Sequence, residues 1–157
     1  MYIPLPQNPN KPSALSEKGK IIFVQQGCVT CHTPPLFTNN KLTPADGFAI
    51  PDEHYSKYDI FDISVGTDPG YTMNTRRGTG YYKTPSLLGL WYRGPFMHDA
   101  TLANLEDLFD PARLKDDYVP TGFKPHDVKT KAVPGHEFGM DLSKAEKEAL
   151  IAYLLTL

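Results

Sequence analysis

Several absences narrow what this sequence of 157 residues can encode. Acidic and basic residues nearly balance, with a formal net charge of -2, so the concentrated basic surface of a nucleic-acid-binding protein is missing. No apolar run approaches the ~20 residues that a membrane span needs. The first thirteen residues are polar and contain four prolines, without the apolar stretch of a secretory signal. We therefore expect no nucleic-acid partner, no membrane span and no signal peptide in this chain.

Cysteine is also scarce, because Cys28 and Cys31 are the only two, and His32 follows directly. A disulfide across three residues would close a very small loop and stabilise little. A zinc site needs two more soft ligands at similar spacing, and a thioredoxin-like pair needs a strand before a helix in an α/β chain. The remaining interpretation is covalent haem attachment through C-x-x-C-H, in which two thiols form thioethers and the histidine binds the iron.

Proline and glycine, in contrast, are abundant. Fifteen prolines and twelve glycines predict that much of the chain forms fixed loops, which a large buried cofactor would give something to pack on. Residues 1–15 are expected to be an extended arm or interdomain linker, since proline forbids a helix there.

Three helices are predicted, so the fold class is expected to be all-α. The first begins at Ser16 as N-cap and leads into the cysteines. The second covers 100–110, with Thr101 as N-cap and leucines at helical spacing. The third covers 143–157, where Ser143 and Glu146 form a capping box before an apolar stripe.

The two ends of the chain, "EKGKIIFVQQGCVTCH" and "LSKAEKEALIAYLLTL", resemble a class I cytochrome c. In that family a glycine and an aromatic residue of the first helix meet an aliphatic and an aromatic residue of the last helix. Gly19 and Phe23 match the first pair, and Leu150 and Tyr153 match the second. The resemblance implies a class I cytochrome c-like fold over residues 16–157, with long loops wrapped around one covalent haem.

The middle of the chain is similar to the C-terminal haem domain of bacterial dihaem cytochrome c peroxidases and related haem oxygenases. The matching motifs are "KTPSL" at 83–87, "PFMHD" at 95–99 and "LANLE" at 102–106. Ala100 replaces the usual glycine, and Leu88 stands where an arginine is common. The chain also carries a single C-x-x-C-H, so it offers no second haem of its own.

The resemblance places the second axial iron ligand in the loop before the last helix. The methionine that dihaem peroxidases use should fall near Val133, which cannot bind iron. We therefore expect iron to be bound by His32 and His136, with Met140, Met97 or a vacant position as the alternatives. Arg93 is expected to pair with a haem propionate, because guanidinium binds carboxylates bidentately.

The function expected from these features is electron transfer by one six-coordinate haem c, to or from a redox protein or an adjacent domain of a larger chain. The alternative is a peroxidase-like haem enzyme with an open sixth position, in which His98 would act as acid and base. A haem-based ligand sensor is a third possibility. Whether the chain is an enzyme is left open. Because covalent haem is assembled outside the cytoplasm, we expect a periplasmic or cell-surface location.

Overall fold

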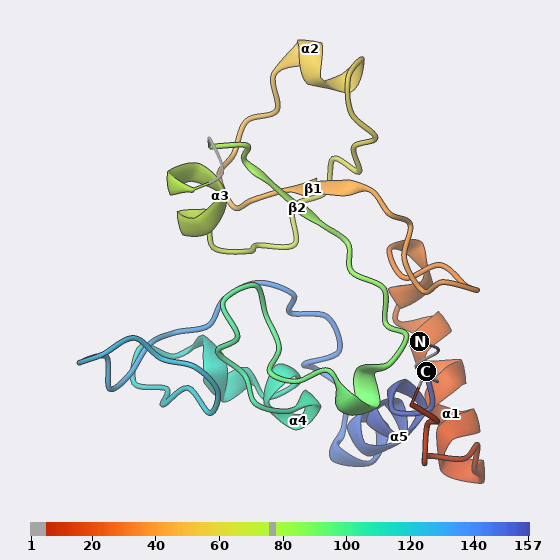
Figure 1. Cartoon of the computed structure of the whole chain (residues 1–157). Helices are drawn as coiled ribbons and strands as arrows, with labels where there is room; N and C mark the ends of the chain where they lie inside the picture. Colours follow the sequence, from red (N-terminus) through yellow and green to blue (C-terminus); the bar gives the residue numbers. More distant parts are fainter. Residues whose placement is uncertain (1–5, 76–77) are drawn as a thin grey trace, which may run out of the picture.

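The computed structural model describes residues 6–75 and 78–157. Helices account for 31% of the residues and strands for 6%, so irregular structure dominates, as the proline and glycine content predicted. In Figure 1, α1, α4 and α5 form the lower and right-hand part of the molecule. The small sheet and two short helices, α2 (Asp52–Tyr55) and α3 (Gly70–Asn74), lie above them.

Helix α1 (Ala14–Gln25) begins earlier than predicted. Ser13 is its N-cap, and Ser16, the expected cap, is the third residue of the helix and is buried. The Ser13 side chain accepts from the Ser16 amide at 3.1 Å, while the Ser16 hydroxyl oxygen accepts from the Ser13 amide at 2.8 Å. This reciprocal capping satisfies two backbone donors at the helix start, which explains why the helix extends back to residue 14.

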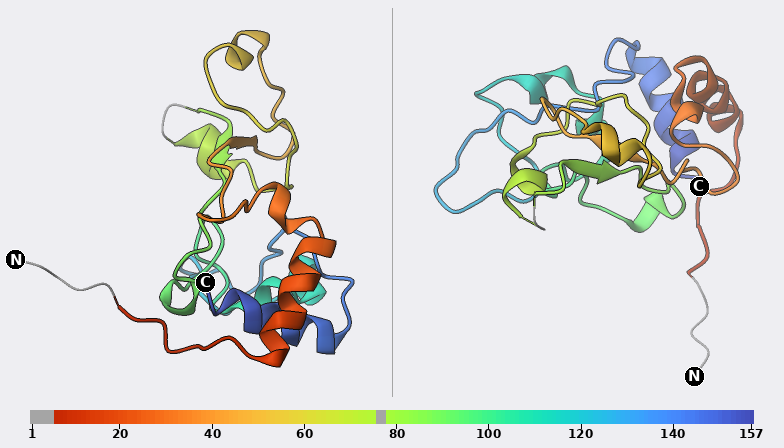
Figure 2. Two further views of the ribbon diagram at one scale, coloured as in Figure 1. Left: turned by 90° about the vertical axis from the view of Figure 1, so that its right-hand side faces the viewer. Right: turned by 90° about the horizontal axis from the view of Figure 1, so that it is seen from above.

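Helix α5 (Lys144–Leu154) has the predicted Ser143–Glu146 capping box and crosses α1 (Figure 2). Gly19 lies against the Ala149 backbone, and the Phe23 and Tyr153 rings meet edge to face with centroids 5.5 Å apart. The crossing predicted from these residues is therefore confirmed. Around it lies the main core cluster, which consists of Phe23, Leu90, Leu105, Phe109, Leu150, Ile151 and Leu154.

The predicted helix over 100–110 is much shorter in the structure. Helix α4 (Leu105–Leu108) has Asn104 as its N-cap, and the Asn104 side chain accepts from the Asp107 amide at 2.8 Å. Thr101 is not the N-cap, because it is buried and its hydroxyl donates to Asp99 at 2.7 Å instead. Three 3-10 helices complete the helical elements of the described residues: η1 (Cys28–Thr30), η2 (Leu90–Tyr92) and η3 (Pro111–Leu114).

The expectation of an all-α fold missed a small sheet. Strand β1 (Leu42–Pro44) pairs antiparallel with β2 (Tyr81–Lys83), with Thr43 opposite Tyr82. Strands of three residues are too short to show a two-residue period in sequence, and both lie in segments predicted as loop. Within the described ranges, none of the helices has the length and apolar character needed to cross a bilayer.

Candidate functional site

The C-x-x-C-H segment follows directly on α1. Gly27 adopts φ +72°, a left-handed conformation that ends the helix and that glycine adopts without steric cost. The turn η1 then carries Cys28 and leads to Cys31. Both are free cysteines and half-buried, and burial raises the pKa of each thiol. The motif is thus presented as two thiols on one tight turn, with Cys28 packed against the main core cluster.

His32 is almost completely buried at the end of this turn. Burial lowers its pKa, so the imidazole is neutral near pH 7. Its Nδ1 lies 3.2 Å from the Phe37 carbonyl oxygen, to which it donates in the tautomer that leaves Nε2 unprotonated. In metal-binding histidines, one ring nitrogen usually binds the metal while the other donates to a carbonyl or carboxylate. In His32 the Nδ1 atom makes this hydrogen bond, so the Nε2 lone pair is available.

His136 faces His32 across the protein interior. The two ring centroids are 6.3 Å apart, with the ring planes inclined by 58°. Burial lowers the pKa of His136 to about 4, and repulsion from His32 adds to this effect, so both imidazoles are neutral. The Nδ1 atom of His136 is buried and has no hydrogen-bond partner among the described residues. An unpaired buried polar group is costly and needs an explanation.

The separation of the two rings fits a metal ion between them. Metal–imidazole bonds are about 2.0–2.1 Å long, and adding roughly 1.1 Å from each nitrogen to its ring centre places collinear rings about 6.3 Å apart. The observed separation is 6.3 Å. Two imidazoles supply only two ligands, and within residues 6–75 and 78–157 no group of three or more His, Cys, Asp or Glu is placed to hold a metal ion. His32 and His136 could therefore hold a metal ion only together with ligands from another source, such as a macrocycle.

The backbone that carries His136 has an uncommon conformation. His136 itself has φ +51° and the preceding Gly135 has φ +86°. A Cβ atom on Gly135 would lie 2.7 Å from the carbonyl oxygen of Gly66, so glycine is required for this close approach. The His136 amide then donates to the Val65 carbonyl at 2.6 Å. A non-glycine residue keeps a positive φ only where its surroundings impose it, as is common at functional sites.

The other sixth-ligand candidates lie in different surroundings. His126 is exposed and paired with Asp127, and the Nδ1 of His54 lies 2.9 Å from the Tyr81 hydroxyl. Met140 and Met97 are half-buried. Of the five histidines, all within the described part of the chain, His136 is the one whose ring lies beside His32.

His98 and Asp99, the expected acid–base pair of the alternative function, do not bond to each other. Burial alone would raise the pKa of Asp99, but hydrogen bonds from Lys131 and Thr101 outweigh burial and lower it. Lys131 Nζ lies 2.9 Å from Asp99 Oδ2. His98 is half-buried beside the Tyr82 ring, and its Nδ1 has no partner among the described residues. The Asp99 carboxylate is thus used to hold Lys131 and Thr101.

The structure shows the contacts of two arginines, Arg93 and Arg113. The guanidinium of Arg93, the expected propionate partner, is exposed and donates to the carbonyls of Ser86 and Leu88 at 2.9 and 2.8 Å. Arg113, to which the sequence gave no reason for a role, is completely buried and donates to the His136 carbonyl at 3.0 Å. Its sequence context, "DPARLKD" at 110–116, is rich in charged residues, so no pattern distinguishes it from a surface arginine.

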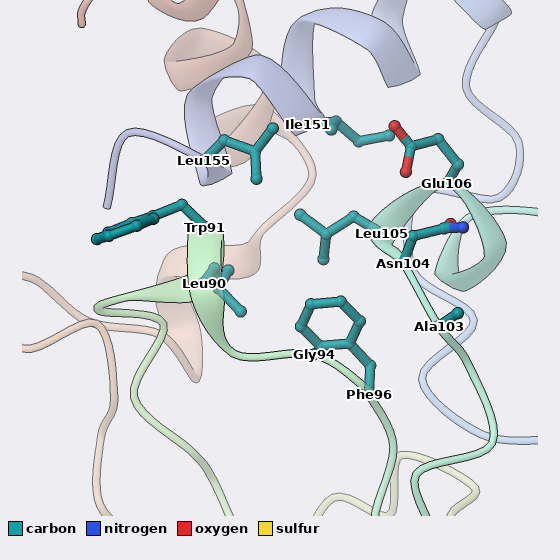
Figure 3. A pocket seen from close by; sticks show the side chains of 10 residues that line it. All are labelled: Leu90, Trp91, Gly94, Phe96, Ala103, Asn104, Leu105, Glu106, Ile151 and Leu155. Atoms are coloured by element: carbon teal, nitrogen blue, oxygen red, sulfur yellow. The ribbon is translucent and has the colours of Figure 1, made fainter. Parts of the chain in front are cut away.

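A shallow apolar pocket of 180 Å³ lies between η2, α4 and α5, away from the two histidines (Figure 3). Its walls include Trp91, Phe96, Leu105 and Ile151. This volume is below the ~300–1,000 Å³ of most small-molecule sites. None of the predicted site residues lines the pocket, so the facing histidines remain the candidate site.

The sequence is similar to those of cytochrome-c peroxidases and of a methylamine utilization protein. No family model matches it. A cytochrome-c peroxidase, IdrP1 of Denitromonas iodatirespirans, is 30% identical over 61% of this chain and 30% of the relative. The methylamine utilization protein MauG of Methylorubrum extorquens is 28% identical over 90% of this chain and 34% of its own length. A cytochrome-c peroxidase of a Pseudomonas species, IdrP2, is 27% identical over 83% of this chain and 36% of its length.

The chain spans about a third of the length of these curated relatives. Their matches cover up to nine-tenths of the chain itself, so the relationship is not confined to the cysteine motif. The resemblance to cytochrome c peroxidases that the internal motifs indicated is confirmed by these matches.

Proposed function

We propose that the chain is a c-type haem domain that transfers electrons, with its haem attached through Cys28 and Cys31 and its iron bound by His32 and His136. The observation that carries this proposal is the pair of neighbouring imidazoles, one on the buried His32 and one on the partly buried His136, whose ring centres are separated by 6.3 Å. Position adds to it, since His32 directly follows the second cysteine. A haem would supply an iron that alternates between two oxidation states.

The two histidines have a defined task in this proposal. Both imidazoles are neutral because burial lowers their pKa values, so each offers a lone pair without first losing a proton. The Phe37 carbonyl orients His32, and the Val65 carbonyl fixes the backbone of His136. Two strong ligands that keep their positions in both oxidation states give a low reorganisation cost, which favours electron transfer over ligand binding.

The proposal also includes the fold, the domain boundaries, the partner and the cellular location. The crossing of α1 and α5 supports a class I cytochrome c-like fold for residues 16–157, with 1–15 as an arm. The partner is proposed to be a redox protein or an adjacent domain, because the relatives are at least twice as long as the chain. Covalent haem attachment places the protein in the periplasm or at the cell surface.

A peroxidase-like enzyme is the second candidate, favoured by the similarity of the chain to cytochrome-c peroxidases. Peroxide must reach the iron itself, so this function requires that His136 leaves the iron or never binds it. The arrangement of the site favours the first candidate, because the His136 loop is held on both sides of the histidine.

Absorption spectra of the haem-loaded protein separate the two functions. Electron transfer predicts a low-spin spectrum in both oxidation states that carbon monoxide and hydrogen peroxide leave unchanged on mixing. His136→Ala is the matched positive control, since it should open the iron and respond to both ligands. A high-spin spectrum of the unaltered protein, with immediate carbon monoxide binding, would reject the electron-transfer proposal and favour the enzyme.

A further inference from the structure

Arg113 is a buried cation whose guanidinium interacts with backbone carbonyls. Arg113 belongs to η3 and is completely buried. Nε donates to the Leu108 carbonyl at 3.0 Å, and Nη1 donates to the Val133 carbonyl. Nη2 donates to both Gly135 and His136, at 2.7 and 3.0 Å. Across the described parts of the chain, no carboxylate lies within ion-pair distance of this guanidinium.

Burying a charged side chain in the core is energetically unfavourable. A buried charge without an opposite partner loses its hydration, and an apolar side chain of similar volume often serves stability as well or better. Burial lowers the pKa of Arg113, in line with that cost. A planar guanidinium with five donors is suited, however, to holding several carbonyls in one fixed arrangement, which neither lysine nor an apolar residue can do.

Three of the four carbonyls belong to one short segment, residues 133–136. This segment contains the two consecutive residues with positive φ, Gly135 and His136. On its other side the His136 amide donates to Val65. The segment is therefore held between Val65, which binds its amide, and Arg113, which binds its carbonyls. Backbone in a sparsely populated conformation persists when its surroundings determine it in this way.

We propose that Arg113 is the positioning residue that keeps His136 directed toward His32. Its hydrogen bonds go to the backbone, so it acts on His136 through the carbonyls of residues 133–136. The inference rests on the proposed function, because it assigns Arg113 the task of keeping the second axial ligand in place. A further hydrogen bond joins Arg113 to the 133–136 segment, because the Val133 amide donates to the Arg113 carbonyl at 2.7 Å.

The test uses the haem-loaded full chain and measures how fast carbon monoxide binds to the reduced protein. In a six-coordinate haem this rate is limited by dissociation of the axial ligand, so it reports how firmly His136 is held. Removing several charge-assisted hydrogen bonds from the segment should raise the rate in Arg113→Met by roughly tenfold or more. Arg113→Lys keeps the charge but fewer bonds, so its rate should lie between those of the unaltered protein and Arg113→Met.

Two control variants separate positioning from general loss of stability. Lys147 donates to the Met140 carbonyl at 2.7 Å, close to the same loop but beyond His136, so Lys147→Met should leave the rate within about twofold. Leu105 belongs to the main core cluster, so Leu105→Ala lowers the melting temperature without touching the 133–136 segment. Its rate should stay close to that of the unaltered protein.

Each result decides the matter. A faster rate in Arg113→Met, partly restored in Arg113→Lys and absent in both controls, supports the inference. Equal rates in Arg113→Met and the unaltered protein, or an equal rise in Leu105→Ala at matched melting temperature, overturn it. If Arg113→Met does not fold, Arg113→Lys decides alone. If His136→Ala remains low-spin and closed to carbon monoxide, His136 is not the ligand, and the proposed function fails together with the inference.

Discussion

Replacing Gly19 by alanine sets two physical effects against each other. In an isolated helix, glycine to alanine stabilises by about 1 kcal/mol, because alanine has the higher helix propensity. In this chain a Cβ at residue 19 would lie 2.5 Å from the carbonyl carbon of Ala149, still nearer to its oxygen, and 2.8 Å from the Cβ of Tyr153. Two of these three atoms belong to the backbone of α5, so no side-chain rotation relieves the contact.

The packing term should therefore win. Overpacking of a well-packed site costs about 1–3 kcal/mol, and a contact with backbone lies at or above the upper end. After the propensity gain, Gly19→Ala should lower the free energy of unfolding by roughly 1–3 kcal/mol. For a chain of this size each kcal/mol corresponds to about 2–4 °C in melting temperature. Gly19→Val, with a larger and β-branched side chain, should cost more than alanine.

Thermal unfolding followed by circular dichroism provides the measurement. Lys20 lies next to Gly19 in the same helix but is exposed, so Lys20→Ala should shift the melting temperature by no more than a degree or two. A higher melting temperature in Gly19→Ala would mean that helix propensity decides the outcome. In that case α1 and α5 do not cross closely at this residue.

Three further predictions concern the covalent attachment of haem, the Lys131–Asp99 ion pair and the loop that carries His136. Acidified acetone should extract the haem from the double variant Cys28→Ala, Cys31→Ala but not from the unaltered protein, and extraction from both would disprove covalent attachment. Lys131→Met should lower stability at pH 7 by about 1 kcal/mol, because the low pKa of Asp99 shows that its ionised form is favoured in the fold. The contribution of the ion pair to stability is complete above pH 3.8, the ordinary pKa of aspartate, and is lost as the pH falls through the lower pKa of Asp99 in the folded protein. Denaturant titrations of the unaltered protein and Lys131→Met should therefore converge in acid. A stability difference that persists in acid would contradict the assignment. Gly135→Ala should raise the high-spin fraction of the haem spectrum, since its Cβ would press on the Gly66 carbonyl, and an unchanged spectrum would show that the loop position is not essential.

The sequence predicted well those features that depend on regular spacing or on a complete local motif. The capping box at Ser143 is a complete local motif that a single chain displays directly, and the meeting of Gly19 and Phe23 with α5 is what the resemblance to class I cytochrome c implied. The start of α1 was misplaced because Ser13 and Ser16 are both good caps, and only the structure shows which backbone amides they bind. Thr101 was taken for a cap because threonine is a good N-cap residue, whereas in the structure its hydroxyl donates to Asp99, two residues earlier.

The candidate site follows the same division. The attachment motif came from residue type and spacing, and the expectation that His136 lies opposite His32 came from the loop in which the family resemblance places the second ligand. The identity of the propionate partner remains a prediction, although Arg93 binds the carbonyls of Ser86 and Leu88 in this structure. Arg113 was not foreseen, because its partners are backbone carbonyls, and a carbonyl leaves no mark on the sequence.

The central claim is that His32 and His136 together bind the iron of a covalent haem. The most direct test is the far-red absorption and electron paramagnetic resonance of the oxidised, haem-loaded protein, compared with His136→Ala and Met140→Leu. The account predicts a low-spin ferric centre without the far-red charge-transfer band of methionine–iron bonding, unchanged in Met140→Leu and converted to high-spin in His136→Ala. A methionine–iron band in the unaltered protein, or a low-spin centre that survives in His136→Ala, would contradict it.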